Sequence, residues 1–182
     1  LLKGESGFHG IGLGTQSTLW SDATVFSTFS ESGGNALMYA MLEYGSRLVL
    51  GNSYESPMHM LDEIWPQVYE YGRKITGNPN LRETFALNSL VGLDNGAWVL
   101  YARENGIANF DDLIPNNFRA ALSHKHSKLA SIPLMAYAIP IEEIKQAVDD
   151  GYFFMKVKIG SPGELEQMLE WDKARIEAIH KA

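Results

Sequence analysis

The sequence contains no cysteine, which excludes disulfide bonds, thiolate metal sites and a cysteine nucleophile. It also lacks an excess of positive charge, since 15 Lys and Arg against 22 Asp and Glu give a formal net charge of −7. This balance argues against nucleic-acid binding and against attachment to membranes through basic residues. No apolar run approaches the roughly 20 residues of a membrane-spanning helix, and no signal-peptide pattern opens the chain. We therefore expect a cytoplasmic protein.

The 182 residues are enough for one compact domain or for parts of two, and the hydrophobic fraction of 45% fits an ordinary globular core. The chain opens at Leu1 without a methionine, and its last predicted helix runs to Ala182 without a cap. We therefore expect the sequence to be a piece of a longer chain.

The first half of the chain combines a start rich in glycine, serine and threonine with three helical stretches. Residues 4–29 alternate apolar and polar positions, which predicts a β-hairpin or strand pair followed by a loop. Apolar residues at helical spacing, together with start signals at Ser56-Pro57 and Asn78-Pro79, then predict helices. These helices cover residues 35–50, 56–76 and 78–103.

A different pattern begins after residue 128. It predicts, in order, a strand over residues 132–137, a helix from Pro140 to Gly151, a strand over residues 151–160 and a helix from Glu164 to Ala182. Alternating strands and helices at this spacing are typical of parallel β/α units. A closed (β/α)8 barrel takes about 250 residues, so this segment predicts the first quarter of a barrel after an α+β domain. The predicted domains are residues 1–128 and 129–182.

Two lysines, Lys156 and Lys158, lie near the end of the strand predicted over residues 151–160. Because strand side chains alternate between faces, both lysines point the same way, together with Phe154. Two ammonium groups on one face of an apolar strand repel each other and lose hydration, which favours a neutral amine that can accept a proton. The alternative is an edge strand whose solvated lysines block aggregation.

Two further patterns allow both a functional and a structural interpretation. The glycines at positions 10, 12 and 14 are similar to a dinucleotide-binding loop, but the spacing is wrong and no helix follows directly, so a glycine-rich strand or turn is favoured. His124 and His126 have a spacing that could bind a metal on a strand, but they lie in a polar connector, so a solvated surface segment is favoured.

Four other residues are candidates on position alone. Tyr137 ends the first strand of the second half and could reach a substrate, with packing as the alternative. Trp20 and Asp22 lie in the glycine-, serine- and threonine-rich segment, where we favour a role in the core or in anchoring a loop. Asp94 is expected to make a structural hydrogen bond. No serine or threonine is paired with a base, so a hydrolase triad is not supported.

Three stretches together resemble the enolase superfamily, in its mandelate racemase/muconate lactonizing branch. They are residues 93–98 (Leu-Asp-Asn-Gly-Ala-Trp), residues 132–137 (Ile-Pro-Leu-Met-Ala-Tyr) and residues 149–160 (Asp-Asp-Gly-Tyr-Phe-Phe-Met-Lys-Val-Lys-Ile-Gly). The layout agrees over most of the chain, and the sequence over about residues 90–102 and 129–180. The resemblance implies an α+β capping domain followed by the first two β/α units of a (β/α)7β TIM-like barrel.

The resemblance also implies a chemistry. A divalent cation, usually Mg²⁺, holds a substrate carboxylate and stabilises the enediolate formed when the neighbouring carbon loses its proton. Lys158 would be the base that removes or returns this proton. Lys156 would stay charged, help Lys158 to lose its own proton and bind the substrate carboxylate, with Tyr137 nearby. The acidic metal ligands of the family would lie beyond Ala182.

The protein implied by the resemblance is an isomerase (racemase, epimerase or cycloisomerase) or a lyase (acid-sugar dehydratase). Its partner is a small-molecule carboxylate rather than nucleic acid or membrane, and it forms a homo-oligomer. Two alternatives stay open. One is a non-catalytic, degenerate barrel that serves binding or assembly, and the other is an anion-binding (β/α)8 enzyme of another family.

Overall fold

A computed structural model describes residues 1–161 and 163–182. The chain divides into two compact units, Leu1–Ala120 (unit 1) and Ala121–Ala182 (unit 2). Unit 1 contains β1 (Leu2–Lys3), β2 (His9–Gly10), α1 (Thr18–Ser21), α2 (Ala23–Val49), α3 (Pro57–Thr76), α4 (Glu83–Glu104), the 3-10 helix η1 (Phe110–Leu113) and α5 (Asn116–Arg119). Unit 2 contains β3 (Leu134–Met135), α6 (Ile141–Asp149), β4 (Lys156–Val157) and α7 (Leu165–Lys181). None of the described helices is long and apolar enough to cross a membrane.

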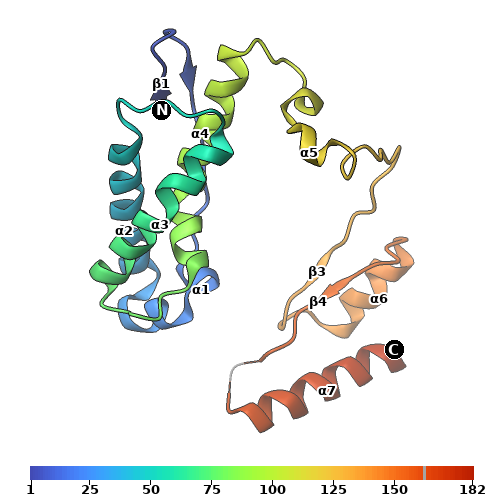
Figure 1. The fold of residues 1–182 in the computed structure, drawn as a ribbon. Coiled ribbons are helices and arrows are strands. Elements are labelled where there is room, and N and C mark those ends of the chain that lie inside the picture. Colours follow the sequence, from blue (N-terminus) through green and yellow to red (C-terminus); the bar gives the residue numbers. More distant parts are fainter. Residues whose placement is uncertain (162) are drawn as a thin grey trace. The chain divides into compact units, whose positions relative to one another are not determined.

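The core of unit 1 lies among α2, α3 and α4, which run side by side and contact one another (Figure 1). The hairpin of β1 and β2 packs against α4. The buried apolar side chains come from all three helices and from the turn before α4, and they are Val25, Met38, Met41, Met60, Ile64, Val68, Leu81, Phe85, Ala86, Leu90, Leu93 and Ala97. The stability of unit 1 therefore depends on helix packing.

The buried carboxylate of Asp22 joins the starts of two helices. Its Oδ1 accepts hydrogen bonds from the N–H groups of Thr24 (2.9 Å) and Val25 (3.0 Å) in the first turn of α2. Its Oδ2 accepts from the N–H of Arg82 (2.9 Å), directly before α4. The first N–H groups of a helix have no partner within the helix, so this carboxylate supplies the missing acceptors. The predicted anchoring role of Asp22 is confirmed, whereas Trp20 is 65% exposed and is not a core residue.

Helix α3 matches its prediction closely. Ser56 accepts a hydrogen bond from the N–H of His59 (3.2 Å), Pro57 is the first helical residue, and Gly77 ends the helix with a left-handed φ of 63°. The predicted start of α4 at residue 78 is wrong, because residues 78–82 form a turn. There the side chain of Asn78 accepts from the N–H of Asn80 (2.9 Å), as in an Asx turn.

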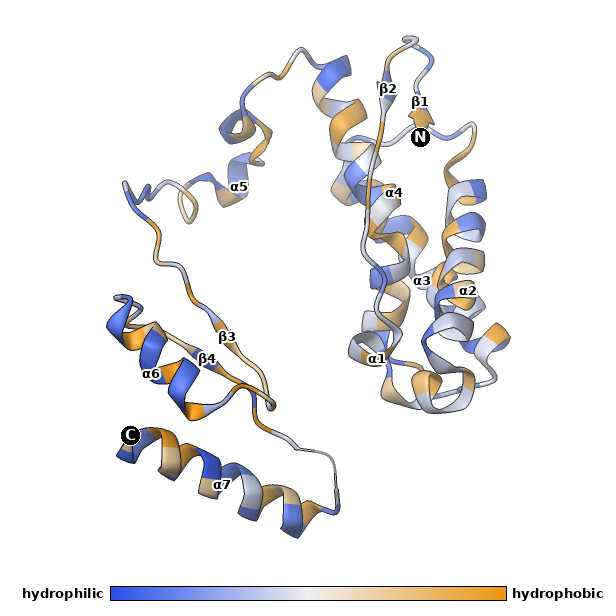
Figure 2. Ribbon diagram, turned by 180° about the vertical axis from the view of Figure 1, so that it is seen from behind, coloured by the Kyte–Doolittle hydropathy of each residue, from blue (hydrophilic) through white to orange (hydrophobic). Residues whose placement is uncertain are grey.

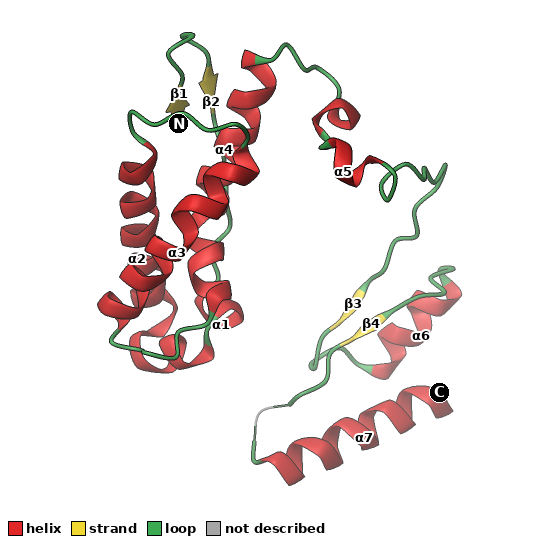
Figure 3. Cartoon of the chain, in the orientation of Figure 1, coloured by secondary structure: helices red, strands yellow, loops and turns green. Residues whose placement is uncertain are grey.

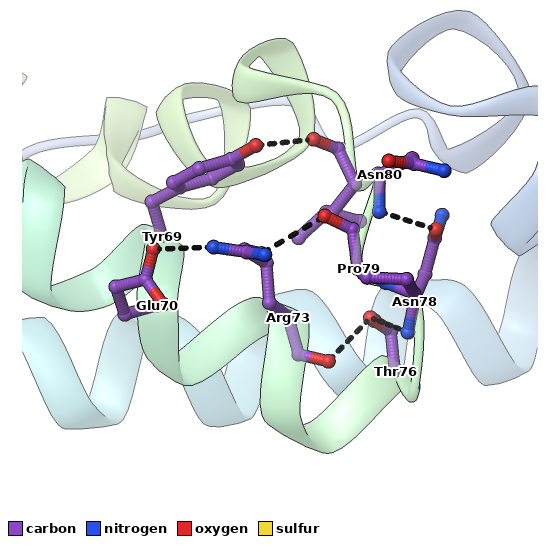
Figure 4. Close-up of polar contacts among 8 residues, drawn as sticks. Tyr69, Glu70, Arg73, Thr76, Asn78, Pro79 and Asn80 are labelled. Carbon is purple, nitrogen blue, oxygen red and sulfur yellow. Dashed lines mark hydrogen bonds and ion pairs between the residues drawn. The ribbon is translucent and has the colours of Figure 1, made fainter.

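Side chains of α3 hold this turn against the helix (Figure 4). The Tyr69 hydroxyl donates to the carbonyl of Leu81 (2.7 Å), and the Nε of Arg73 donates to the carbonyl of Pro79 (3.0 Å). Arg73 also forms an ion pair with Glu70 (2.8 Å). The turn between α3 and α4 is therefore well defined, which fixes how the two helices pack.

The three glycines at positions 10, 12 and 14 have a structural role. They lie on an extended segment that passes over α4, where a Cβ on Gly12 would collide with backbone atoms of Gly92 and Gly96. Side chains of α4 bind the carbonyls of this segment: Asn95 donates to Leu13 (2.7 Å), and Arg103 donates to His9 (2.6 Å). The interpretation as a glycine-rich strand or turn, rather than a dinucleotide loop, is therefore supported by the packing.

In unit 2, β3 and β4 pair in parallel and are connected through α6 (Figure 3). The register sets Leu134 opposite Lys156 and Met135 opposite Val157. Helix α7 follows and contacts α6. Apolar and polar residues are interspersed along α7 (Figure 2). The predicted positions of these two strands and two helices are thus recovered, with much shorter strands.

The predicted fold class is wrong. The structure is mostly helical, at 59%, with two small sheets of two strands each, and neither β/α barrel units nor an α+β capping domain is present in the described residues. Parallel strands of a barrel are buried on both faces, whereas Leu134 is 50% exposed and Phe154 is 59% exposed. From Thr18 onward, much of the segment predicted as strand and loop is helical, because Asp22 caps α2. The predicted domain boundary after residue 128 stays a prediction.

Candidate functional site

The candidate site lies at the carboxyl ends of β3 and β4. The N–H of Lys156 donates to the carbonyl of Pro133 (3.0 Å), and the N–H of Lys158 donates to the carbonyl of Met135 (2.9 Å). Parallel pairing therefore brings the end of β3 beside the end of β4. Lys158 directly follows β4, so its side chain leaves the chain at this edge.

The two lysines alternate with Val157 as the sequence predicts. Val157 is half-buried, and Lys156 and Lys158 are both exposed. Side chains two residues apart on a strand leave the backbone roughly 7 Å apart. The predicted loss of hydration is not found, because both lysines are exposed. The structure agrees with one part of the prediction: two lysines lie close together at the end of a strand that pairs in parallel.

Tyr137 lies two residues after β3 and contacts the chain that leaves β4. Its hydroxyl donates to the carbonyl of Ile159 and to the carbonyl of Gly160 (3.1 Å). Its ring meets the ring of Trp171 edge-on, with centroids 5.8 Å apart. These contacts suit the packing alternative, and substrate binding by Tyr137 stays a prediction.

Two charged residues of α7, Asp172 and Arg175, also reach this edge. Asp172 is buried and its Oδ2 accepts a hydrogen bond from the N–H of Gly160 (2.6 Å). The Nη2 of Arg175 donates to the carbonyls of Ala136 (2.9 Å) and Ile139 (3.1 Å), in the loop after β3. Sequence reasoning missed both residues. The available signal was that Asp172 follows Leu165 and Met168 at helical spacing, on a stripe expected to be apolar.

The described residues do not offer a metal site. They contain no group of three or more His, Cys, Asp or Glu side chains that could hold a metal ion. The resemblance places the ligands of Mg²⁺ beyond Ala182, so the magnesium site stays a prediction. His124 and His126 lie with ring centroids 4.5 Å apart and are both exposed, which agrees with the interpretation as a surface segment.

Unit 1 has a cavity of about 610 Å³ and a carboxyl group with an altered pKa, and neither involves the lysine site. The cavity is lined by residues of β1, of the loop between α2 and α3, and of the end of α4.

Burial raises the pKa of Asp94 on α4 above its ordinary value of 3.8, and a hydrogen bond with Trp98 partly offsets this effect. The contact with Trp98 agrees with the structural role that we expected for Asp94.

Comparison of the chain with protein families, with curated proteins and with solved structures gave no match.

Proposed function

We propose that the chain contributes an acid–base lysine to an enzyme that moves the proton on the carbon next to a carboxylate. The observation that carries the proposal is the parallel pairing of β3 with β4, which sets Lys158 at the carboxyl edge of the pair with Lys156 two residues before it. The carboxyl edge of parallel strands is where substrates of α/β enzymes bind. An exposed ammonium group beside a base is suited to a carboxylate substrate.

In this mechanism the lone pair of Lys158 Nζ accepts the α-proton, and Nζ becomes an ammonium group. The electron pair of the broken C–H bond stays on the substrate and is shared with its carboxylate. Lys156 remains an ammonium group and attracts the carboxylate, whose negative charge grows in this step. Return of a proton from Lys158 restores the substrate, and in D2O the returned nucleus is deuterium. No step is assigned to a metal.

The test is α-proton exchange in D2O. The intact protein is incubated with lactate, mandelate and gluconate, with and without Mg²⁺, and the α-proton signal is followed by NMR. Loss of a general base typically costs about 10²–10⁴-fold in rate, so Lys158→Ala should reduce exchange by about this factor. Lys156→Ala should mainly raise KM, because it removes a charge that binds the carboxylate.

Lys145→Ala is the matched control, since Lys145 is an exposed lysine of α6. It should exchange at the parent rate. If Lys158→Ala exchanged as fast as the parent, Lys158 would not be the base. If no compound of the panel exchanged with the parent protein, the proposed activity would be wrong for these hydroxy and sugar acids.

Binding or assembly is the second candidate function, and exposed aromatic residues favour it. Phe153 is 78% exposed and Phe154 is 59% exposed, with ring centroids 4.9 Å apart. Neighbouring exposed apolar side chains are typical of surfaces that meet a partner. A second copy of the chain would fit the expected homo-oligomer. Sedimentation of the protein and of a Phe153→Ser, Phe154→Ser double variant tests the assembly role, which predicts a smaller species for the variant, and an unchanged species would contradict it.

A further inference from the structure

Helix α7 connects to the backbone that follows both strands of unit 2. Asp172 binds the chain after β4, and Arg175, one helical turn later, binds the chain after β3. We call these two residues the α7 anchor pair. Each of the two side chains hydrogen-bonds to the backbone after one of the strands. The proposed base, Lys158, lies between the end of β4 and Gly160, the residue whose N–H donates to Asp172.

The contact of Asp172 fixes the direction in which the chain leaves β4. Its Oδ2 accepts from the N–H of Gly160 at 2.6 Å, a short distance for a hydrogen bond from a backbone amide to a carboxylate. Gly160 has a left-handed φ of 85°, so the chain turns sharply there. Lys158 is only two residues away. A shift of this turn would therefore move the Lys158 backbone as well.

The contact of Arg175 holds the other strand end. Its Nη2 donates to the carbonyls of Ala136 and Ile139, on either side of the turn that contains Tyr137. The guanidinium group also lies over the ring of Trp171, 5.6 Å from its centroid. The Tyr137 hydroxyl in turn donates to Ile159 and Gly160. Two sets of hydrogen bonds therefore connect the strand ends. One is made by Tyr137, which follows β3 and binds the chain after β4, and the other by Asp172 and Arg175 of α7.

The anchor pair is a costly way to pack a helix. Asp172 is 8% exposed, and its Oδ1 and the Nε of Arg175 are buried without a hydrogen-bond partner among the described residues. Buried charged groups whose hydrogen bonds are incomplete destabilise a fold relative to apolar side chains of similar size. Buried polar atoms without partners are expected at functional sites, where the placement of a side chain matters more than the stability of the fold.

We infer that Asp172 and Arg175 are positioning residues for Lys158. They keep the ends of β3 and β4 in register, so that Nζ of Lys158 stays aligned with the carbon that carries the proton. This inference rests on the proposed function. Lys156 is less dependent on the anchor pair, because it lies four residues before Gly160, whereas Lys158 lies two residues before it.

The test compares Asp172→Ala and Asp172→Asn in the D2O exchange assay, using the acid on which the parent protein is active. A misplaced catalytic group costs up to about 100-fold in rate, so Asp172→Ala should lower kcat on the order of 10-fold to 100-fold, with KM changed less than about twofold. The amide oxygen of asparagine can still accept from Gly160, so Asp172→Asn should restore most of kcat. Glu177→Gln, an exposed position of α7 that pairs with Lys173 and Lys181, is the control and should match the parent.

A second measurement, amide hydrogen exchange at Gly160 and Lys158, reports position without activity. Both amides should exchange faster in Asp172→Ala and at the parent rate in Asp172→Asn and Glu177→Gln. Unchanged amide exchange in Asp172→Ala would overturn the inference, as would faster amide exchange with an unchanged kcat. If the parent protein catalyses no α-proton exchange, the proposed function fails by itself. Amide exchange then still decides whether Asp172 holds this strand end.

Discussion

Asp94 and Asp22 belong to the same helical unit and differ in what surrounds their carboxylates. Asp22 accepts three backbone hydrogen bonds at the starts of α2 and α4. Asp94 lies within α4, where burial raises the pKa of its carboxyl above 3.8 and the hydrogen bond with Trp98 lowers it again in part. The carboxylate of Asp22 accepts hydrogen bonds from N–H groups that have no partner within their helices. The carboxylate of Asp94 loses hydration on burial, and its hydrogen bond with Trp98 offsets only part of that loss. Ionisation of Asp94 is therefore expected to make unit 1 less stable.

We predict that Asp94→Asn removes a pH-dependent loss of stability. The raised pKa means that the folded state holds this proton more tightly than the unfolded state. The contribution of Asp94 is thus fully favourable below its unfolded pKa and is lost as the pH rises through its higher folded pKa. Relative to the parent, Asp94→Asn should gain stability as the pH rises through and above 3.8, the ordinary pKa of this carboxyl, as measured by urea unfolding at a series of pH values.

Trp98→Phe gives a second variant for the same effect. It removes the hydrogen bond that lowers the pKa of Asp94, so stability should fall more steeply with rising pH than in the parent. A constant difference between Asp94→Asn and the parent across this pH range would contradict the prediction.

At the scale of elements, the extended segment after β2 depends on glycine because it contacts α4 through backbone. The nearest atoms to a Cβ on Gly12 would belong to the main chain of Gly92 and Gly96. A Cβ on Gly92 would lie 3.7 Å from the nearest atom, the amide nitrogen of Gly14, which is ordinary contact. The two glycines face each other across one interface and differ in the space available to them.

We predict opposite effects for Gly12→Ala and Gly92→Ala. Gly12→Ala should destabilise unit 1 by about 1–3 kcal/mol, the usual cost of overpacking, because the segment must move away from α4. Gly92→Ala should be neutral or stabilise by up to about 1 kcal/mol, because alanine is the better helix former. Thermal unfolding followed by circular dichroism measures both. Equal losses in the two variants would show that the segment does not lie on α4 as described.

The strand elements of unit 2 contrast with the helices of unit 1. The sequence predicts ten residues of strand over 151–160, and the pairing with β3 involves Lys156 and Val157. Apolar alternation is enough to favour an extended chain, but a strand needs a neighbour for its hydrogen bonds. Asp172 and Arg175 then supply contacts at the strand ends that the alternation could not indicate.

At the scale of the whole molecule, the buried apolar side chains are unevenly divided. All 12 residues of the core cluster belong to unit 1, whereas Met135 and Ile144 are the buried apolar residues found in the described part of unit 2. Burial of apolar surface is the main favourable term in folding. Unit 1 should therefore be stable by itself, and unit 2 should contribute little to cooperative unfolding.

We predict that a fragment of residues 1–120 unfolds cooperatively, with the same midpoint as the main transition of the full chain. A fragment of residues 121–182 should unfold without a sharp transition, because two buried apolar side chains cannot offset the entropy of ordering the chain. Urea unfolding of the three proteins, followed by circular dichroism, is the measurement. A fragment 1–120 without a cooperative transition would show that unit 1 needs contacts that its own core does not supply.

The sequence by itself determined part of the local structure. Capping and periodicity located α3 almost to the residue, and they located α6, α7 and the body of α2 and α4, because these signals act between neighbours in the chain. Strand alternation also predicted that Lys156 and Lys158 share one face of their strand. Only the tertiary structure decided the rest: the helical packing of unit 1, the exposure of the lysines, the contact of Gly12 with α4, and the arrival of Asp172 and Arg175 at the strand ends. These features join residues far apart in the chain, and burial and hydrogen bonding between such residues depend on three-dimensional neighbours that no local pattern specifies.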